Sequence, residues 1–325
     1  MDSMLAAVVE MAGKPAISKT IARPTPKAGE VLVRVKASGI NPLDLKIRAG
    51  LAAHAKQPLP AILGIDLAGV VEDLGDGVTE FSVGDEVYGM TGGVGGHQGS
   101  LAQYSAVDVR LIAQKPSSIT MREAAALPLA AITAWEGVID LAHVKAGEKL
   151  LVIGAGGVGQ MVIQIGRAIG ADVYAIDRSK GEFITDMGAT SLAVDTGILE
   201  HLEVHTSGHG FDVVYDTVGG EGLDTAFAAV ARRGRVVSCL GWGTHALAPL
   251  SFKSASYAGV FTLVPLLTGE GRERHGEILR EVASIVDDGK LRALVDGRTY
   301  GLDTLDDAFS LLESRANTGK VVVSL

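Results

Sequence analysis

Residues 149–177, KLLVIGAGGVGQMVIQIGRAIGADVYAID, decide the fold of this chain. A short apolar run predicts a buried strand, Gly154, Gly156 and Gly159 follow it as GxGxxG, and a second apolar run ends at Asp177. This order of strand, glycine turn, helix, strand and acid is the fingerprint of a dinucleotide site. Gly154 permits a tight turn, Gly156 lets the backbone approach a pyrophosphate, and Gly159 lets the helix pack close to the strand. We therefore predict a dinucleotide at the N-terminus of this helix.

The composition is typical of an α/β enzyme. The chain has 325 residues, of which 47% are hydrophobic and 42 are glycine. A net charge of −9 argues against nucleic acid or an anionic membrane surface as a partner. No apolar run reaches the roughly 18 residues of a membrane span. The single cysteine, Cys239, and an N-terminus unlike a signal peptide predict a cytoplasmic location.

The periodicity of the sequence changes along the chain and predicts two domains. Residues 1–120 contain short apolar runs separated by Gly, Pro and Asp, which is typical of β-structure. Beyond them helices and strands alternate, which predicts a doubly wound parallel sheet. We expect a β-rich domain of residues 1–122 and 266–325, and a dinucleotide-binding domain of residues 123–265.

The expected elements can be placed by their residue numbers. Thr120 with Glu123 and Ser179 with Glu182 have the spacing of capping boxes at helix starts. Residues 260–264 form the last, edge strand of the parallel sheet in this prediction. The other expected strands are 5–10, 30–38, 68–74, 86–89, 150–153, 173–176, 191–194, 213–216, 236–240, 293–300 and 321–325, and the helices are 133–142, 158–169, 180–187, 199–205, 222–231, 275–288 and 304–313.

Short motifs along nearly the whole chain carry a family resemblance. Besides the glycine turn they are ASGINPLD (37–44), IRAG (47–50), GIDLAGVV (64–71), VGDEVYG (83–89), TAWEG (133–137), DTVGG (216–220) and TGKVV (318–322). Together they resemble the medium-chain dehydrogenase/reductase superfamily, and within it the zinc-independent, zeta-crystallin-like quinone oxidoreductases. The resemblance implies a GroES-like catalytic domain and a Rossmann domain with the active site in the cleft between them. It also implies a homodimer that covers the edge strand.

The positions of zinc ligands in this superfamily hold other residues here. The resemblance places the ligand cysteine of the zinc enzymes at Asn41 and their His-Glu pair at Ile65 and Asp66. A catalytic zinc takes about three protein ligands, so we expect no zinc. We also expect His201, His205 and His209 to form a solvated helix face rather than a metal site. The side chains expected to be structural are Asp44, Asp66 and Cys239. Tyr88 and Tyr104 are candidate proton donors that we expect to be structural instead.

Chemistry without a metal favours a conjugated acceptor. Hydride addition to an isolated carbonyl builds a full charge on one oxygen, whereas a quinone or an enone delocalises that charge. We therefore predict an oxidoreductase that transfers hydride from NAD(P)H to a quinone or an α,β-unsaturated carbonyl. Two alternatives stay open. One is a reductase of another carbonyl or of an enoyl thioester, and the other is a non-catalytic NAD(P)H-binding protein with a structural or interaction role.

The resemblance and the glycine turn together nominate site residues. Asn41 can donate to a substrate carbonyl, Lys46 can place positive charge near a developing anion, and Thr133 resembles the threonine beside the nicotinamide. The carboxylate at Asp177 favours NADH because it would accept the ribose hydroxyls, yet nearby basic residues could hold the 2′-phosphate of NADPH. The expected cofactor-binding residues are Gly154, Gly156, Gly157, Val158, Gly159, Asp177, Arg178, Lys180, Thr217, Val218, Leu240, Gly241, Phe261 and Leu263.

Overall fold

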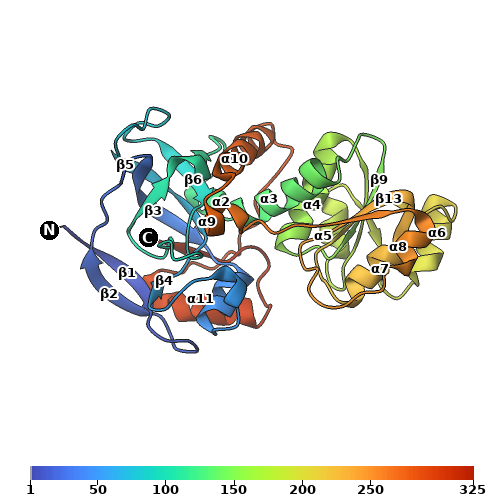
Figure 1. The fold of residues 1–325 in the computed structure, drawn as a ribbon, viewed down its shortest axis with the longest axis horizontal. Helices are drawn as coiled ribbons and strands as arrows, with labels where there is room; N and C mark the ends of the chain where they lie inside the picture. The colour runs from blue at the N-terminus through green and yellow to red at the C-terminus, as the bar shows by residue number, and fades with distance from the viewer. Residues whose placement is uncertain (1) are drawn as a thin grey trace. The chain divides into compact units, whose positions relative to one another are not determined.

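The computed structural model describes residues 2–325 and divides them into two compact units (Figure 1). Unit 1 comprises the residues up to Leu129 together with Leu263–Leu325, and unit 2 comprises Ala130–Thr262. Unit 1 contains antiparallel sheets and unit 2 a parallel sheet with helices. The predicted fold class, a GroES-like β-rich domain plus a Rossmann domain, is confirmed.

Unit 1 is built on two sheets. The smaller has the strand order β2-β1-β4, and the larger has the order β15-β3-β5-β6-β8 with β7 beside β3. Valines alternate along β3, at Val31, Val33 and Val35, and bury one face of the larger sheet in the core. The strands are β1 (Ser3–Val9), β2 (Ile17–Ala22), β3 (Glu30–Gly39), β4 (Ala61–Ile62), β5 (Asp66–Leu74), β6 (Glu86–Met90), β7 (Tyr104–Asp108), β8 (Ile112–Gln114) and β15 (Val322–Ser324).

Short helices complete unit 1. The predicted capping box is present, because the Glu123 carboxylate accepts from the Thr120 N–H at 2.8 Å and the Thr120 hydroxyl accepts from the Glu123 N–H at 3.3 Å. The helices are α1 (Pro42–Arg48), α2 (Met121–Ala125), α9 (Val264–Thr268), α10 (Arg272–Asp287) and α11 (Leu305–Glu313), with 3₁₀ turns η1 (Ala53–Ala55), η2 (Val109–Leu111) and η4 (Leu302–Thr304).

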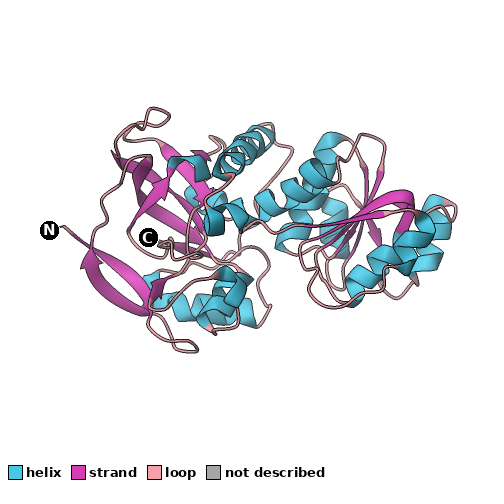
Figure 2. Ribbon diagram, in the orientation of Figure 1, coloured by secondary structure: helices cyan, strands magenta, loops and turns pink. Residues whose placement is uncertain are grey.

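Unit 2 has six parallel strands in the order β11-β10-β9-β12-β13-β14. The chain order reverses between β9 and β12, and ligands of such sheets bind where the strands end at this switch point. Figure 2 shows helices on both faces of the sheet. The strands are β9 (Lys149–Ile153), β10 (Asp172–Ile176), β11 (Thr190–Leu192), β12 (Phe211–Asp216), β13 (Val230–Ser238) and β14 (Ser256–Gly259), and the helices are α4 (Gly157–Ile169), α5 (Gly181–Asp186), α6 (Ile198–Thr206), α7 (Glu221–Ala229) and α8 (Ala248–Lys253).

The predicted last strand at residues 260–264 is wrong. The edge strand is β14, and the chain then turns into α9, which begins at Val264. Pro265 lies in the first turn of α9. Proline lacks the N–H that a sheet ladder needs but suits the start of a helix, so this apolar run ends as a helix.

Three further expectations differ from the structure. Residues 293–300 form only isolated bridges at Val295 and Tyr300 instead of a strand. Ser179 does not cap a helix, because Lys180 is the N-cap of α5 and has no side-chain capping bond. The expected helix 133–142 is the end of α3 (Pro128–Trp135) followed by a π-helical segment, η3 (Glu136–Leu141).

Candidate active site

The glycine turn after β9 has the geometry that its sequence predicts. Gly154 has φ +88°, a conformation that favours glycine, and a Cβ there would lie 2.7 Å from the Thr217 hydroxyl. A Cβ at Gly159 would lie 1.8 Å from the Gly154 carbonyl oxygen, so helix α4 packs against the turn. At Gly156 and Gly157 a Cβ would meet nothing within 4 Å. The open space lies over the N-terminus of the 13-residue helix α4, where unbonded N–H groups attract a phosphate.

Asp177 stabilises this turn from the end of β10. One carboxylate oxygen accepts from the Ala155 N–H at 2.8 Å, and the other accepts from the Ser179 N–H at 3.0 Å. The Lys180 ammonium donates to the Ala155 carbonyl at 3.2 Å from the same side of the turn. Arg178 is exposed. The carboxylate is therefore already engaged by backbone donors, a role that the sequence analysis did not assign to it.

The ends of the neighbouring strands bring more of the nominated residues to the turn. The Thr217 hydroxyl donates to the Ile153 and Gly154 carbonyls at 2.9 and 3.0 Å, and Val218 is 56% exposed. Asp216, which is fully buried, accepts from the Val218 N–H at 3.0 Å and thereby shapes the loop after β12. Val158 lies in the first turn of α4.

The remaining nominated residues lie beyond β13 and β14. Leu240 and Gly241 follow β13, and a Cβ at Gly241 would lie 2.1 Å from the Tyr257 hydroxyl. Phe261 is 38% exposed, and its ring stands edge-on to that of Trp242 with centroids 6.1 Å apart. Leu263 is buried at the N-cap of α9 and belongs to unit 1, so the structure does not group it with the others.

Thr133 is buried on α3 and connects several polar groups of unit 2. Its hydroxyl lies 3.1 Å from the Thr262 hydroxyl, which in turn donates to the Glu136 carboxylate at 2.8 Å. The Thr133 carbonyl accepts from the Tyr215 hydroxyl at 2.7 Å. These contacts fix the position of Thr133.

Unit 1 holds a buried polar cluster formed by Asn41, Asp44, Asp66 and Lys320. The Asn41 side-chain amide donates to Asp66 at 2.9 Å, and its oxygen accepts from the Lys320 ammonium. Lys320 also forms an ion pair with Asp66 at 3.0 Å. The second Asp66 oxygen accepts from the Leu129 N–H at 2.8 Å, at the start of α3. Asn41, Asp44 and Asp66 are 2%, 0% and 0% exposed, so these three side chains are shielded from bulk solvent.

Asp44 completes this polar cluster by fixing backbone positions. Its two oxygens accept from the Asn41 and Gly64 N–H groups at 2.8 and 3.0 Å. Burial raises the pKa of the Asp44 carboxyl to about 7, although both backbone bonds act to lower this pKa and the charge of Asp66 raises it further. The expectation that Asp44 and Asp66 are structural acids agrees with these contacts.

Among the described residues, the side chains of Lys46, Tyr88 and Tyr104 form no hydrogen bond or ion pair with the polar cluster. Lys46 is exposed on α1, and within residues 2–325 its side chain forms no hydrogen bond or ion pair. Tyr88 is buried and donates to the Leu279 carbonyl at 2.6 Å, and burial raises the pKa of its phenol. The Tyr104 ring lies under the Arg23 guanidinium at 4.1 Å.

The expected solvated histidine face is wrong for His201. This residue is 5% exposed, and its Nε2 lies 2.8 Å from the Ala193 carbonyl oxygen. His205 stacks near it with ring centroids 5.9 Å apart. Burial also raises the pKa of the Cys239 thiol to about 12, so that side chain stays protonated near neutral pH.

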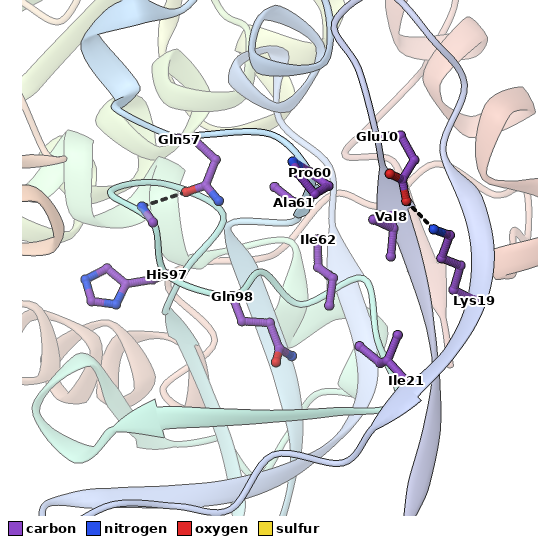
Figure 3. Close-up of a pocket in the computed structure, with 11 residues that line it drawn as sticks. Val8, Glu10, Lys19, Ile21, Gln57, Pro60, Ala61, Ile62, His97 and Gln98 are labelled. Carbon is purple, nitrogen blue, oxygen red and sulfur yellow. Dashed lines mark hydrogen bonds and ion pairs between the residues drawn. The ribbon is translucent and has the colours of Figure 1, made fainter.

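Unit 1 also contains a surface pocket of about 390 Å³ between the smaller sheet and the loop at residues 96–98 (Figure 3). Glu10 and Lys19 form an ion pair on one side, and Gln57 accepts from the Gly96 N–H at 2.9 Å on the other. None of the residues expected to be catalytic or to bind the cofactor lines this pocket, although Gly96, His97 and Gln98 belong to a glycine-rich loop at 92–99 that could equally be a flexible surface loop or border a substrate cleft.

Comparisons with known proteins now identify the family. Residues 27–117 match the family described as alcohol dehydrogenase GroES-like domain, and residues 169–323 match the family described as zinc-binding dehydrogenase. A 2-methylene-furan-3-one reductase of Solanum lycopersicum is 37% identical over 94% of this chain and 74% of that protein. The chain belongs to the medium-chain dehydrogenase/reductase superfamily. The predicted resemblance is thereby confirmed.

Two further relatives support this membership. An NADPH-dependent alkenal/one oxidoreductase of Arabidopsis thaliana, described as chloroplastic, is 35% identical over 94% of this chain and 75% of that protein. The crystal structure of an alcohol dehydrogenase superfamily protein from Novosphingobium aromaticivorans is 52% identical, covers 99% of both chains and has a TM-score of 0.97. The dehydrogenase/reductase fold is thus matched along 99% of this chain.

One matched family is described as zinc-binding. Among residues 2–325 no group of three or more His, Cys, Asp or Glu side chains could hold a metal. Asn41, where the resemblance places a ligand cysteine of the zinc enzymes, is bonded to Lys320. None of the helices in the described chain has the length and apolar composition of a transmembrane helix.

The sequence analysis missed Lys320. The TGKVV motif was noted for its resemblance only, and the Asp66 partner of Lys320 lies 254 positions away in the chain. One feature of the TGKVV motif could have indicated the role of Lys320. A lysine next to the buried final strand needs a buried acid to offset its charge.

Proposed function

We propose that this protein reduces the carbon–carbon double bond of α,β-unsaturated carbonyl compounds with a nicotinamide cofactor. The observation that carries the proposal is the alignment of 94% of the chain with two relatives, both named for conjugated carbonyl substrates. Quinones are acceptors of the same chemical class. The cofactor supplies a hydride when it is bound, and the glycine turn and the N–H groups of α4 would hold its pyrophosphate.

The proposal assigns each unit its own task. In unit 2 the backbone at Gly156 and Gly157 would hold the cofactor's phosphates, and Thr133, fixed by Thr262 and Tyr215, would contact its nicotinamide. In unit 1 the buried polar cluster would supply a hydrogen-bond donor for the acceptor's oxygen. Delocalisation of charge into the conjugated substrate lets this chemistry run without zinc.

A panel of acceptors tests the proposed reaction. Oxidation of NADPH is followed at 340 nm with an enone, the matching saturated ketone, a quinone and an enoyl thioester, each with and without chelator. We expect turnover of the enone and the quinone at rates that the chelator does not change. Reduction of the saturated ketone alone, or turnover that requires zinc, would refute the proposal.

NADPH is the cofactor that we propose. The Asp177 carboxylate is engaged by Ala155 and Ser179, which leaves exposed Arg178 as the side chain to meet a 2′-phosphate. This differs from the preference for NADH that the acid alone suggested. The ratio of kcat/KM for the two cofactors tests it, and a ratio that favours NADH would refute it.

We also propose a homodimer formed along β14. Within residues 2–325 this strand pairs only with β13, and large apolar side chains nearby are exposed: Trp242 56%, Leu247 60% and Phe252 89%. An unpaired edge with apolar neighbours favours pairing across a twofold axis. Light scattering should give twice the chain mass of 33.6 kDa at micromolar concentration. A monomer would contradict the proposal.

A further inference from the structure

The Asn41 amide has no donor left for a substrate. An amide nitrogen carries two protons. One is donated to Asp66 at 2.9 Å, and the nitrogen also faces the Gly39 carbonyl oxygen at 3.5 Å. The amide oxygen accepts from Lys320, and the whole residue is 2% exposed. The Asn41 N–H groups, which were expected to donate to a substrate carbonyl, therefore already face acceptors of the protein.

The Lys320 ammonium does have a donor left. It carries three N–H bonds, of which one goes to the Asn41 oxygen and one to Asp66 at 3.0 Å. Within residues 2–325 the third N–H has no partner. The Lys320 side chain is 10% exposed while its Asp66 partner is 0% exposed. Lys320 is thus the one cluster member with both an unused donor and a surface that reaches solvent.

We infer that Lys320 is the electrophile of the acceptor site and that Asn41 and Asp66 position it. The inference rests on the proposed enone reduction. When hydride adds to the β-carbon, a C–H bond forms there, the π electrons of the double bond move toward the carbonyl, and its oxygen becomes negative. The third N–H of Lys320 donates to that oxygen. Water then delivers a proton to the α-carbon, which gives the saturated carbonyl compound and the oxidised cofactor.

Fixed partners make Lys320 suited to this task. A donor that is held before the reaction need not reorganise when charge develops, and a dry surrounding strengthens the interaction. Lys46, the lysine nominated from the sequence, has no such partners. The competing explanation is that Lys320 only offsets the charge of buried Asp66. Both explanations predict damage when Lys320 alone is removed, so the test must remove the acid as well.

The test compares three variants of the full chain. Lys320→Met removes the ammonium, and the double variant Lys320→Met, Asp66→Asn removes both charges while leaving an oxygen to accept from Leu129. Lys115→Met is the matched control, because Lys115 has a side chain 6% exposed and pairs with Glu86 at 3.2 Å elsewhere in unit 1. For each variant we would measure kcat with para-substituted benzylideneacetones, the Kd of NADPH by fluorescence, and the thermal midpoint.

Loss of one oxyanion donor should lower kcat by about 100- to 1,000-fold in both Lys320 variants. The Kd of NADPH should stay within about twofold, and the Lys115 control should keep its kcat whatever its stability. The dependence of kcat on electron-withdrawing substituents should become steeper without Lys320, which a merely structural lysine would not cause. Wild-type kcat in the folded double variant would overturn the inference alone. An inactive wild-type protein would overturn the proposed function together with it.

Discussion

The glycine turn of unit 2 and the polar cluster of unit 1 are two candidate sites, and they are built in opposite ways. The turn is local, since its glycines, its helix and its supporting acid all lie within residues 149–177. The polar cluster is assembled from the N-cap and first turn of α1, the start of β5 and Lys320, two residues before the last strand. A local backbone feature leaves a contiguous pattern in the sequence, whereas the partners in a cluster of distant side chains leave no such pattern.

The largest expected effect tests the glycine turn of unit 2. Gly156→Val places a branched side chain into the open space over α4 and should raise the Kd of NADPH by at least about a thousandfold, because several charged hydrogen bonds of roughly 1.5–3 kcal/mol are lost. The fold should survive. Calorimetric titration with NADPH and a thermal melt would check this, and unchanged affinity in the folded variant would remove the site.

Gly159→Ala is the matched comparison within the same turn. Its Cβ would lie 1.8 Å from the Gly154 carbonyl oxygen, so this change should reduce the stability of unit 2 as well as nucleotide affinity. A Gly159→Ala protein with wild-type stability would show that the turn tolerates more than its geometry suggests.

The next effect tests the polar cluster of unit 1 through the pH dependence of stability. The folded pKa of Asp44 is about 7 and its ordinary value is 3.8, so the folded state binds this proton more tightly. The stability from Asp44 is complete below about pH 4 and is lost as pH rises through 7, by up to about 4 kcal/mol at 1.36 kcal/mol per pKa unit. Urea unfolding of wild type and Asp44→Asn from pH 4 to 8 should show a downward slope that only wild type has.

The exposed acid Asp76 supplies the control for that slope. Asp76→Asn should leave the wild-type pH dependence in place. If Asp44→Asn and Asp76→Asn have the same slope as wild type, the polar cluster does not hold a proton near neutral pH.

A smaller effect separates the contribution of the Arg178 side chain from that of the glycine-turn backbone to cofactor binding. Arg178→Ala should raise the KM for NADPH roughly fivefold and leave that for NADH unchanged, because an exposed ionic contact contributes about 1 kcal/mol. Arg232→Ala, at another exposed arginine of unit 2, should change neither. Equal effects of Arg178→Ala on both cofactors would place the 2′-phosphate elsewhere.

The smallest expected effect is none. Because Asn41 and Lys320 bond to each other where the resemblance places a zinc ligand, treatment with chelator should leave kcat within error, and metal analysis should find no stoichiometric zinc. One tightly bound zinc per chain would contradict this reading of the polar cluster.

The elements that the sequence predicted well follow from local rules. The strands and helices from 149 to 238 have apolar periods, glycines and short loops that act over a few residues. The edge strand was misplaced by four residues because the apolar run before Pro265 carries no strand-specific signal. His201 was misjudged because a helical pattern does not show which neighbour covers a polar side chain. Lys320 was missed because its partners lie more than 250 positions away.

Deuterium transfer is the measurement that tests the central claim most directly. Wild-type protein is given benzylideneacetone and NADPH that carries deuterium at both C4 positions, and the product is analysed by NMR. Enone reduction predicts 4-phenylbutan-2-one with deuterium at the β-carbon and a solvent proton at the α-carbon. Deuterium on the carbinol carbon of an allylic alcohol, or no product at all, would contradict the claim.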